Sequence, residues 1–216
     1  MSYTHVGNAQ NYNAAVAITV SAGDLVVVSV SWNDSTSTPA VPTDGLGNTY
    51  TLIGYARDTF AGSSTGVYQS IVTTGGSASI FFPTPPSGPQ YVVNRYTGLV
   101  ASSVSVTNYM NGTLTTATDA LTSTTLTPGS QPGMLFAAGY VDSSQVLASG
   151  TGFTNRTPAG ETRNFYVEDA PIASVSAVAA TFTYTAGTAT HGIVVAAYFA
   201  ESGPPASYPM SSEMYF

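Results

Sequence analysis

The segment Leu25–Trp32 reads Leu-Val-Val-Val-Ser-Val-Ser-Trp, and it decides the fold class. Its β-branched residues favour an extended chain, in which successive side chains point to opposite faces. The segment is apolar on both faces at its start and on one face at its end. It therefore predicts a strand that is buried on both faces early and on one face later.

The rest of the chain repeats this pattern. Short runs rich in Val, Ile, Thr, Tyr and Phe alternate with clusters of Gly, Pro, Asn and Asp, and helical periodicity is almost absent. We expect further strands at residues 14–20, 49–55, 65–73, 77–82, 90–96, 120–126, 134–141, 162–168, 174–185 and 192–199. Residues 83–89 begin and end with proline and form a loop. The chain is therefore predicted to be all-β.

Three landmarks occur twice, in the same order and roughly one hundred residues apart. They are residues 22–27 and 131–136, residues 47–51 and 152–154, and residues 90–96 and 191–199. We interpret them as two pseudo-repeats, residues 1–100 and 101–200, followed by an extended arm at residues 201–216. The alternative is that any two β segments of this size look alike. The predicted fold is an antiparallel β-sandwich, Ig-like or jelly-roll-like, and whether the repeats form one body or two stays open.

Composition excludes several functions. The chain has 216 residues, no cysteine, four Lys+Arg and eleven Asp+Glu, for a net charge of -7. All four cations are arginines, so neither a Schiff-base lysine nor a thiol nucleophile is present. Nucleic acid is not an expected partner, because four scattered arginines cannot neutralise the phosphates that binding requires. No cofactor is expected.

Residues 1–5 have neither the basic nor the apolar region of a signal peptide, and no apolar run approaches the length of a membrane span. We expect synthesis as a soluble product in the cytoplasm and no membrane insertion.

The candidate catalytic groups have structural explanations. Residues 62–66 fit the Gly-x-Ser-x-Gly nucleophile motif, but a strand signal follows instead of the helix that this motif needs, so a hairpin loop is preferred. Of the two histidines, His5 lies near the terminus and His191 precedes a predicted strand. Strand alternation places Glu168 and Asp169 on opposite faces, which disfavours an acid pair. We expect no enzymatic activity.

Asp44 and Asn48 have the spacing of two calcium ligands, but the other acidic ligands of a calcium loop are missing. A turn explains them better, because Gly45 and Gly47 can supply positive φ. No metal site is expected.

Trp32 is the single tryptophan. The preferred interpretation is a core or rim indole whose N–H is hydrogen-bonded at the strand end, and the alternative is a platform that contacts glycans.

The last segment starts with Gly203-Pro204-Pro205 and ends in large apolar side chains. Proline favours an extended arm over a sheet. We predict that the arm docks on another subunit, with packing against its own sandwich as the competing explanation. The predicted interface residues are Tyr208, Met210, Met214, Tyr215 and Phe216.

Several motifs carry a resemblance to a known group of proteins. They are the Gly-Asp-Leu-Val-Val-Val strand that ends at Trp32, the stretch at 44–52, Tyr68, the stretch at 96–99, and the stretches at 150–154 and 167–169. Together they resemble the β-sandwich modules of bacterial surface proteins and phage virion proteins.

Combined with the weakly charged, Tyr-rich composition, this resemblance implies a non-enzymatic virion structural protein of a tailed bacteriophage. We expect a capsid decoration (cement) or other accessory protein on the virion exterior, with other virion proteins and copies of itself as partners. The alternative is a tail-fibre or adhesin module that binds host-surface glycans. A glycosidase or esterase has the least support, because an acid–base pair is missing.

Overall fold

The computed structural model describes residues 3–12, 14–34, 36–38, 40–102, 104–114, 120–128, 132–142, 147–158, 164–173, 176–184 and 189–203, with the backbone alone for residues 108–114, 184, 189 and 190. These residues form antiparallel sheets and no helix. The strands are β1 (Thr4–Tyr12), β2 (Val16–Val20), β3 (Leu25–Trp32), β4 (Thr51–Asp58), β5 (Ser63–Ile71), β6 (Gly76–Ile80), β7 (Gln90–Thr97), β8 (Val104–Leu114), β9 (Ala120–Thr122), β10 (Gly133–Val141), β11 (Leu147–Ala148), β12 (Thr154–Asn155), β13 (Phe165–Ile172), β14 (Thr181–Tyr184) and β15 (Ala189–Ala200).

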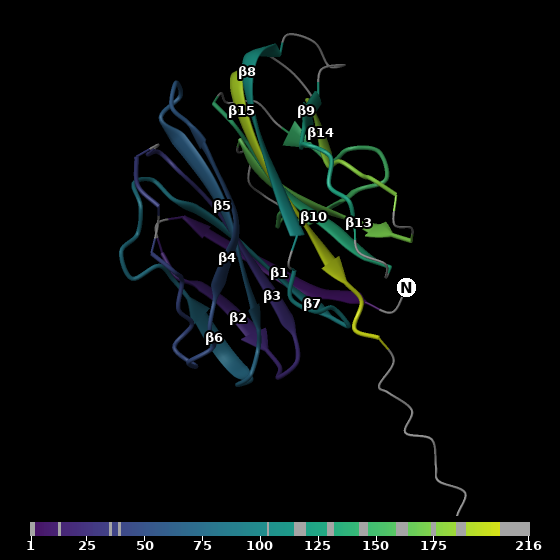
Figure 1. The fold of residues 1–216 in the computed structure, drawn as a ribbon. Helices are drawn as coiled ribbons and strands as arrows, with labels where there is room; N and C mark the ends of the chain where they lie inside the picture. The colour runs from purple at the N-terminus through teal and green to yellow at the C-terminus, as the bar shows by residue number, and fades with distance from the viewer. Residues whose placement is uncertain are drawn as a thin grey trace, which may run out of the picture.

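Two large sheets occupy the middle of the molecule. One is five-stranded with the order β1-β7-β3-β5-β4, and the other is five-stranded with the order β12-β13-β10-β15-β8. A two-stranded sheet, β2-β6, and a three-stranded sheet, β11-β14-β9, complete the fold. In Figure 1 the purple and blue strands of the first half lie beside the green and yellow strands of the second. The all-β sandwich fold expected from the sequence is therefore confirmed.

The sheets stack because each large sheet is apolar on both faces. Leu25 and Val27 of β3 belong to the same central core, between the two large sheets, as Met134 and Phe136 of β10. The alternate residues of β3, β5 and β7 face the β2-β6 sheet, and those of β10, β13 and β15 face the β11-β14-β9 sheet. Burial on both faces explains why these strands read as nearly continuous apolar runs. The result is four layers of strands with three cores.

The prediction that β3 is buried on one face only in its later part is wrong. Every residue of β3 is buried, and Ser29 and Ser31 are 0% and 1% exposed. Both lie on the same face as Leu25 and Val27, which the second half of the chain covers. Small hydroxyl side chains are accommodated there, and Ser31 donates a hydrogen bond to the carbonyl of Ser64 at 3.2 Å.

The two halves of the chain use the same strand order. Each strand of the first half has a counterpart in the second. The order of the first large sheet, β1-β7-β3-β5-β4, corresponds strand by strand to the order of the second, β8-β15-β10-β13-β12. In the same way the β2-β6 pair corresponds to the β9-β14 pair. The repeated sequence landmarks fall on counterpart positions: on β3 and β10, at the starts of β4 and β12, and on β7 and β15. The strand order thus recurs between the halves, and the division into pseudo-repeats at residues 1–100 and 101–200 stays a prediction.

The large sheets approach each other closely along one side. At Gly54 of β4, a Cβ atom would lie 2.4 Å from Cγ1 of Val195 in β15. Next to it, the side chain of Gln69 exchanges two hydrogen bonds with the backbone of Ser102, at 2.9 and 2.6 Å. On the opposite side, between β1 and β12, lies a pocket lined by Pro171 and otherwise by polar residues.

Candidate functional site

The pocket between β1 and β12 gathers four titratable side chains, those of Tyr3, His5, Arg156 and Asp169. We call it the seam pocket, because it lies where the two halves meet, and its volume is about 450 Å³. Strand β1 contributes Thr4 and His5, while β12, β13 and the residues beside them contribute the other wall. The lining residues are Tyr3, Thr4, His5, Thr154, Arg156, Asp169 and Pro171.

Asp169 is the centre of this pocket. Its side chain is 1% exposed, and its Oδ2 atom accepts hydrogen bonds from the hydroxyl of Tyr96 at 2.8 Å and from Nε of Arg156 at 2.6 Å. Tyr96 belongs to the first half and Arg156 to the second, so this carboxylate links the halves. Buried carboxylates require such partners, because an unpaired charge is costly in an apolar core. Among the described residues, the terminal nitrogens of Arg156 make no hydrogen bond.

The remaining groups of the seam pocket are uncharged at neutral pH. Burial, with the Arg156 charge adding to it, lowers the pKa of His5, whose Nε2 lies 3.1 Å from Oδ1 of Asn94. Burial also raises the pKa of Tyr3 to about 12, with the charge of Asp169 contributing. The pocket therefore offers hydroxyl groups, one imidazole and one arginine whose charge Asp169 balances. Such a lining can form hydrogen bonds with a polar ligand.

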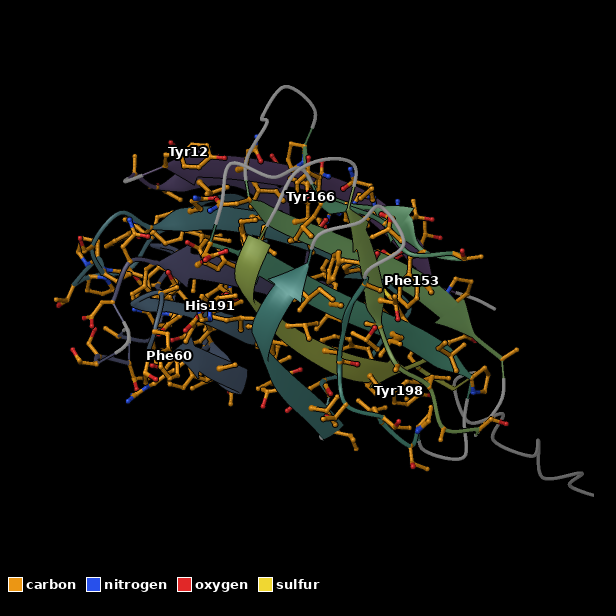
Figure 2. All side chains as sticks on the ribbon, turned by 90° about the horizontal axis from the view of Figure 1, so that it is seen from above. Tyr12, Phe60, Phe153, Tyr166, His191 and Tyr198 are labelled. Atoms are coloured by element: carbon orange, nitrogen blue, oxygen red, sulfur yellow. The ribbon has the colours of Figure 1, made fainter. Side chains whose placement is uncertain are left out.

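A second polar cluster lies at the other end of the central core. Asp58 is 1% exposed, and its Oδ1 accepts hydrogen bonds from the backbone N–H of Phe60 and of Ala61, which fixes the β4–β5 turn. Its Oδ2 lies 3.6 Å from Nδ1 of His191, which is part of β15 and stacks on Phe60 with 5.8 Å between ring centroids. Figure 2 shows Phe60 and His191 close together. The first-half turn thus rests on a second-half strand.

The structure supports a structural role for the Gly-x-Ser-x-Gly segment. Its central residue, Ser64, lies in β5 and is 0% exposed, and its hydroxyl donates to the carbonyl of Asp34 at 2.7 Å. A nucleophile elbow instead presents its serine at a sharp turn between a strand and a helix. Ser64 consequently packs inside the sandwich. The predicted hairpin loop is right only at Gly62, which lies in the β4–β5 turn with φ of 67°, because residues 63–66 already belong to β5.

Glu168 and Asp169 point to opposite faces of β13, as strand alternation predicted. Asp169 faces the central core, whereas Glu168 faces the outer core, where its Oε2 accepts a hydrogen bond from the N–H of Gly150 at 2.9 Å. Burial raises the pKa of Glu168 to about 8. The two carboxyl groups therefore do not form an acid pair across a substrate.

The turn interpretation of Asp44 and Asn48 agrees with the structure. Gly45 and Gly47 have φ of 74° and 83°. The Asp44 carboxylate accepts hydrogen bonds from the Leu46 N–H at 2.8 Å and from Nδ2 of Asn48 at 2.6 Å. In the part of the chain that the structure describes, no three or more His, Cys, Asp and Glu side chains form a metal-binding group.

The glycan-platform alternative for Trp32 is contradicted. Trp32 is 1% exposed and its ring stacks on Tyr55, with 5.6 Å between centroids, so no free face is available to a sugar. The preferred core interpretation fits, but the predicted hydrogen bond does not: Nε1 has no partner among the described residues. The indole contributes by packing in the core between β3 and the β2-β6 sheet.

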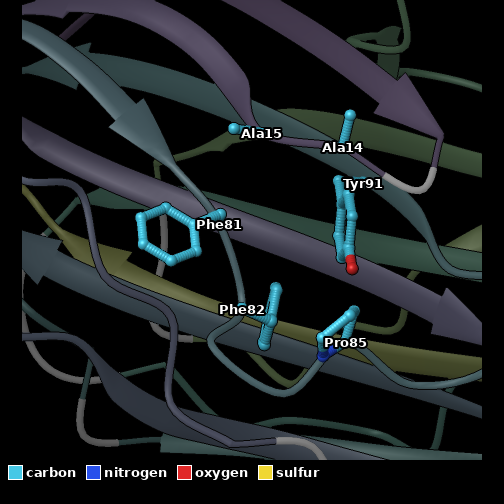
Figure 3. A pocket seen from close by; sticks show the side chains of 6 residues that line it. All are labelled: Ala14, Ala15, Phe81, Phe82, Pro85 and Tyr91. Carbon is cyan, nitrogen blue, oxygen red and sulfur yellow. The ribbon is translucent and has the colours of Figure 1, made fainter.

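An apolar pocket that the sequence did not predict lies beside the loop at 83–89. We call it the aromatic groove; it has a volume of about 260 Å³. Phe82 and Tyr91 stack with 5.2 Å between ring centroids, and Phe81, which is 41% exposed, stands beside them (Figure 3). The lining residues are Ala14, Ala15, Phe81, Phe82, Pro85 and Tyr91. The adjacent phenylalanines before Pro83 were the only signal for it in the sequence.

The predicted interface residues of the arm, Tyr208, Met210, Met214, Tyr215 and Phe216, lie outside the described residues.

Comparison of the chain with models of protein families, with curated proteins and with solved structures finds no match. Among the described residues, no helix has the length and apolar character needed to cross a membrane.

Proposed function

We propose that this chain is a non-enzymatic structural protein of a tailed bacteriophage, a capsid decoration (cement) or other accessory protein on the virion exterior. It acts by forming contacts with other virion proteins and with copies of itself. The observation that carries the proposal is that side chains of the types used in catalysis are buried and have structural roles here. Ser64, Glu168 and Asp169 are all at most 1% exposed, and their hydrogen bonds hold strands or loops in place.

The weak surface charge supports the same function. Only 7% of the residues are charged, so most of the surface that a neighbour would touch is uncharged, and salt screens the repulsion that the net charge of -7 produces between copies. Apolar side chains such as Phe60, which is 72% exposed, and Val41, which is 49% exposed, provide area that a neighbour can cover. When many copies bind to one shell, their individually weak contacts together give strong attachment.

The test is the location of the chain in particles. Mass spectrometry of purified virions should detect it at high copy number, and a mild wash that releases exterior proteins should remove it while DNA stays packaged. A chain that is absent from purified particles, or that is released only when the shell is dissolved, contradicts the proposal.

One observation favours the glycan-binding alternative. The seam pocket is lined by hydroxyl groups of Tyr3, Thr4 and Thr154 and by Arg156, all of which hydrogen-bond sugars well. A glycan array probed with the chain and with the Thr154→Ala and Thr127→Ala variants tests it, since Thr127 is exposed but lies outside the pocket. This alternative predicts a glycan signal that only Thr154→Ala reduces; the absence of any signal contradicts it.

A further inference from the structure

We infer that the aromatic groove binds the proline-rich segment 203–210 of a second copy of this chain. The inference rests on the proposed function, because it names the contact that would join neighbouring copies.

The chemistry of the groove selects an apolar, extended ligand with free carbonyl groups. Its lining contains no Asp, Glu, His, Lys or Arg. The stacked rings of Phe82 and Tyr91 form its floor, and Pro85 and Ala14 are exposed at its edge. Burial raises the pKa of Tyr91 to about 12, so its hydroxyl keeps its proton and can donate. Among the described residues no hydrogen bond perturbs the pKa of that hydroxyl, and Figure 3 shows it directed toward Pro85.

These are the features by which aromatic grooves recognise polyproline II segments. Proline rings fill the spaces between aromatic side chains, and a Tyr or Trp donor bonds a backbone carbonyl of the peptide. The segment Gly-Pro-Pro-Ala-Ser-Tyr-Pro-Met at 203–210 has this composition and carries no charge. Proline also fixes the backbone before binding, which lowers the entropy cost of docking.

The fold separates the groove from the start of this segment. Tyr91 is the second residue of β7, whereas the chain leaves the sandwich beside the other end of β7, where the N–H of Ser202 donates to the carbonyl of Gly98 at 2.9 Å. At a rise of about 3.3 Å per residue, the two places are roughly 20 Å apart. A neighbour placed end to end brings its groove next to Gly203, so the contact joins unlike surfaces, head to tail.

A binding assay tests the inference. A fluorescent peptide of residues 203–216 should bind the variant that stops after Gly203. The Ala14→Trp variant fills the groove from an exposed position and should weaken binding at least tenfold. Phe60→Ser, which removes an exposed ring outside the groove, should leave affinity unchanged. Equal binding to the Ala14→Trp variant, or no binding to either, overturns the assignment.

Isotope-mixed crosslinking decides whether the segment comes from a second copy. A photo-crosslinker at position 208 of the full chain is activated in an equal mixture of light and ¹⁵N-labelled protein. We expect crosslinks that join position 208 of a light chain to residues 81–91 of a heavy chain, and the reverse. If every crosslink joins two light peptides or two heavy peptides, the chain binds its own arm and the inference is overturned. If the chain is found in virions but its arm fails these tests, the proposed function stands and this inference is wrong. If the arm binds the groove but the chain is absent from virions, only the proposed function is contradicted.

Discussion

Glu168 is a fully buried carboxyl group whose Oε1 has no hydrogen-bond partner among the described residues. Its folded pKa of about 8 lies above the ordinary value of 4.5, so the unfolded chain releases the proton first as the pH rises. The folded state thus loses stability between about pH 5 and pH 8, by roughly 1.4 kcal/mol per pH unit from this group.

We expect Glu168→Gln to remove this pH dependence while keeping an acceptor for the Gly150 N–H. Urea unfolding of both proteins across this range measures it: the stability of the variant relative to the native chain should rise with pH and level off above about pH 8. A constant difference would mean that Glu168 does not bind a proton more tightly in the folded state.

Arg156 and Tyr96 contribute unequally to the same carboxylate. Removing Arg156 leaves Asp169 charged and buried, so Arg156→Ala should cost roughly 3 kcal/mol of unfolding free energy. Tyr96→Phe removes one hydrogen bond but leaves the ion pair, and should cost about 1–2 kcal/mol. Chemical denaturation is the measurement, with Arg57→Ala as control: Arg57 is exposed and forms no ion pair among the described residues. A similar cost for both arginines would refute this role of Asp169.

At the scale of the strand, Gly54 sets the distance between the two large sheets. A Cβ atom there would overlap Val195, which is 0% exposed and cannot move away freely. Gly54→Ala should therefore destabilise the fold by about 1–3 kcal/mol. Gly7 is a matched control, because it also adjoins a bulge in an edge strand but has no atom within 4 Å of an added Cβ.

A second substitution makes this prediction specific. Val195→Ala removes the atom that an alanine at 54 would touch, so the double variant should be more stable than the sum of the single changes by about 1 kcal/mol or more. Additive losses would show that the cost at Gly54 arises from backbone conformation alone.

The sequence predicted the central strands well and the edge strands poorly. β3, β7, β10 and β15 are covered on both faces, so their apolar runs are long and unambiguous. Edge strands β1 and β8 were missed because Asn, Gln, Ser and Thr make up four of the nine residues of β1 and five of the eleven of β8, which weakens the apolar pattern. Within the predicted strand at 174–185, the described residues 176–180 lie outside any strand, and β14 covers Thr181–Tyr184.

The seam pocket was beyond prediction for a related reason. Tyr3 and His5 are separated from Arg156 and Asp169 by about 150 residues, and only the stacking of two sheets brings them together. Local patterns do specify turns, as at Asp44, and strand alternation did place Glu168 and Asp169 on opposite faces. Local patterns do not specify which two sheet faces pack together, because any apolar face can pack on any other.

At the scale of the whole molecule, the central core is shared, with Val27 and Val67 from one half packing with Phe136 and Val195 from the other. Neither half can bury these residues alone, although each has an outer core of its own. We therefore expect the intact chain to unfold in one transition, and fragments 1–100 and 101–203 to expose an apolar sheet face when separated.

Mixing the fragments should restore the fold, because the missing layer is supplied by the partner. Separate fragments should bind a dye for exposed apolar surface and melt without a cooperative transition, while the mixture should elute as a single complex with native-like thermal unfolding. The Gly54→Ala substitution in the first fragment should weaken this complementation, since it acts at the face that the second fragment covers. If fragment 1–100 melts cooperatively by itself at the temperature of the intact chain, the outer core between β3 and the β2-β6 sheet is sufficient and the stacking of the halves adds no stability to it.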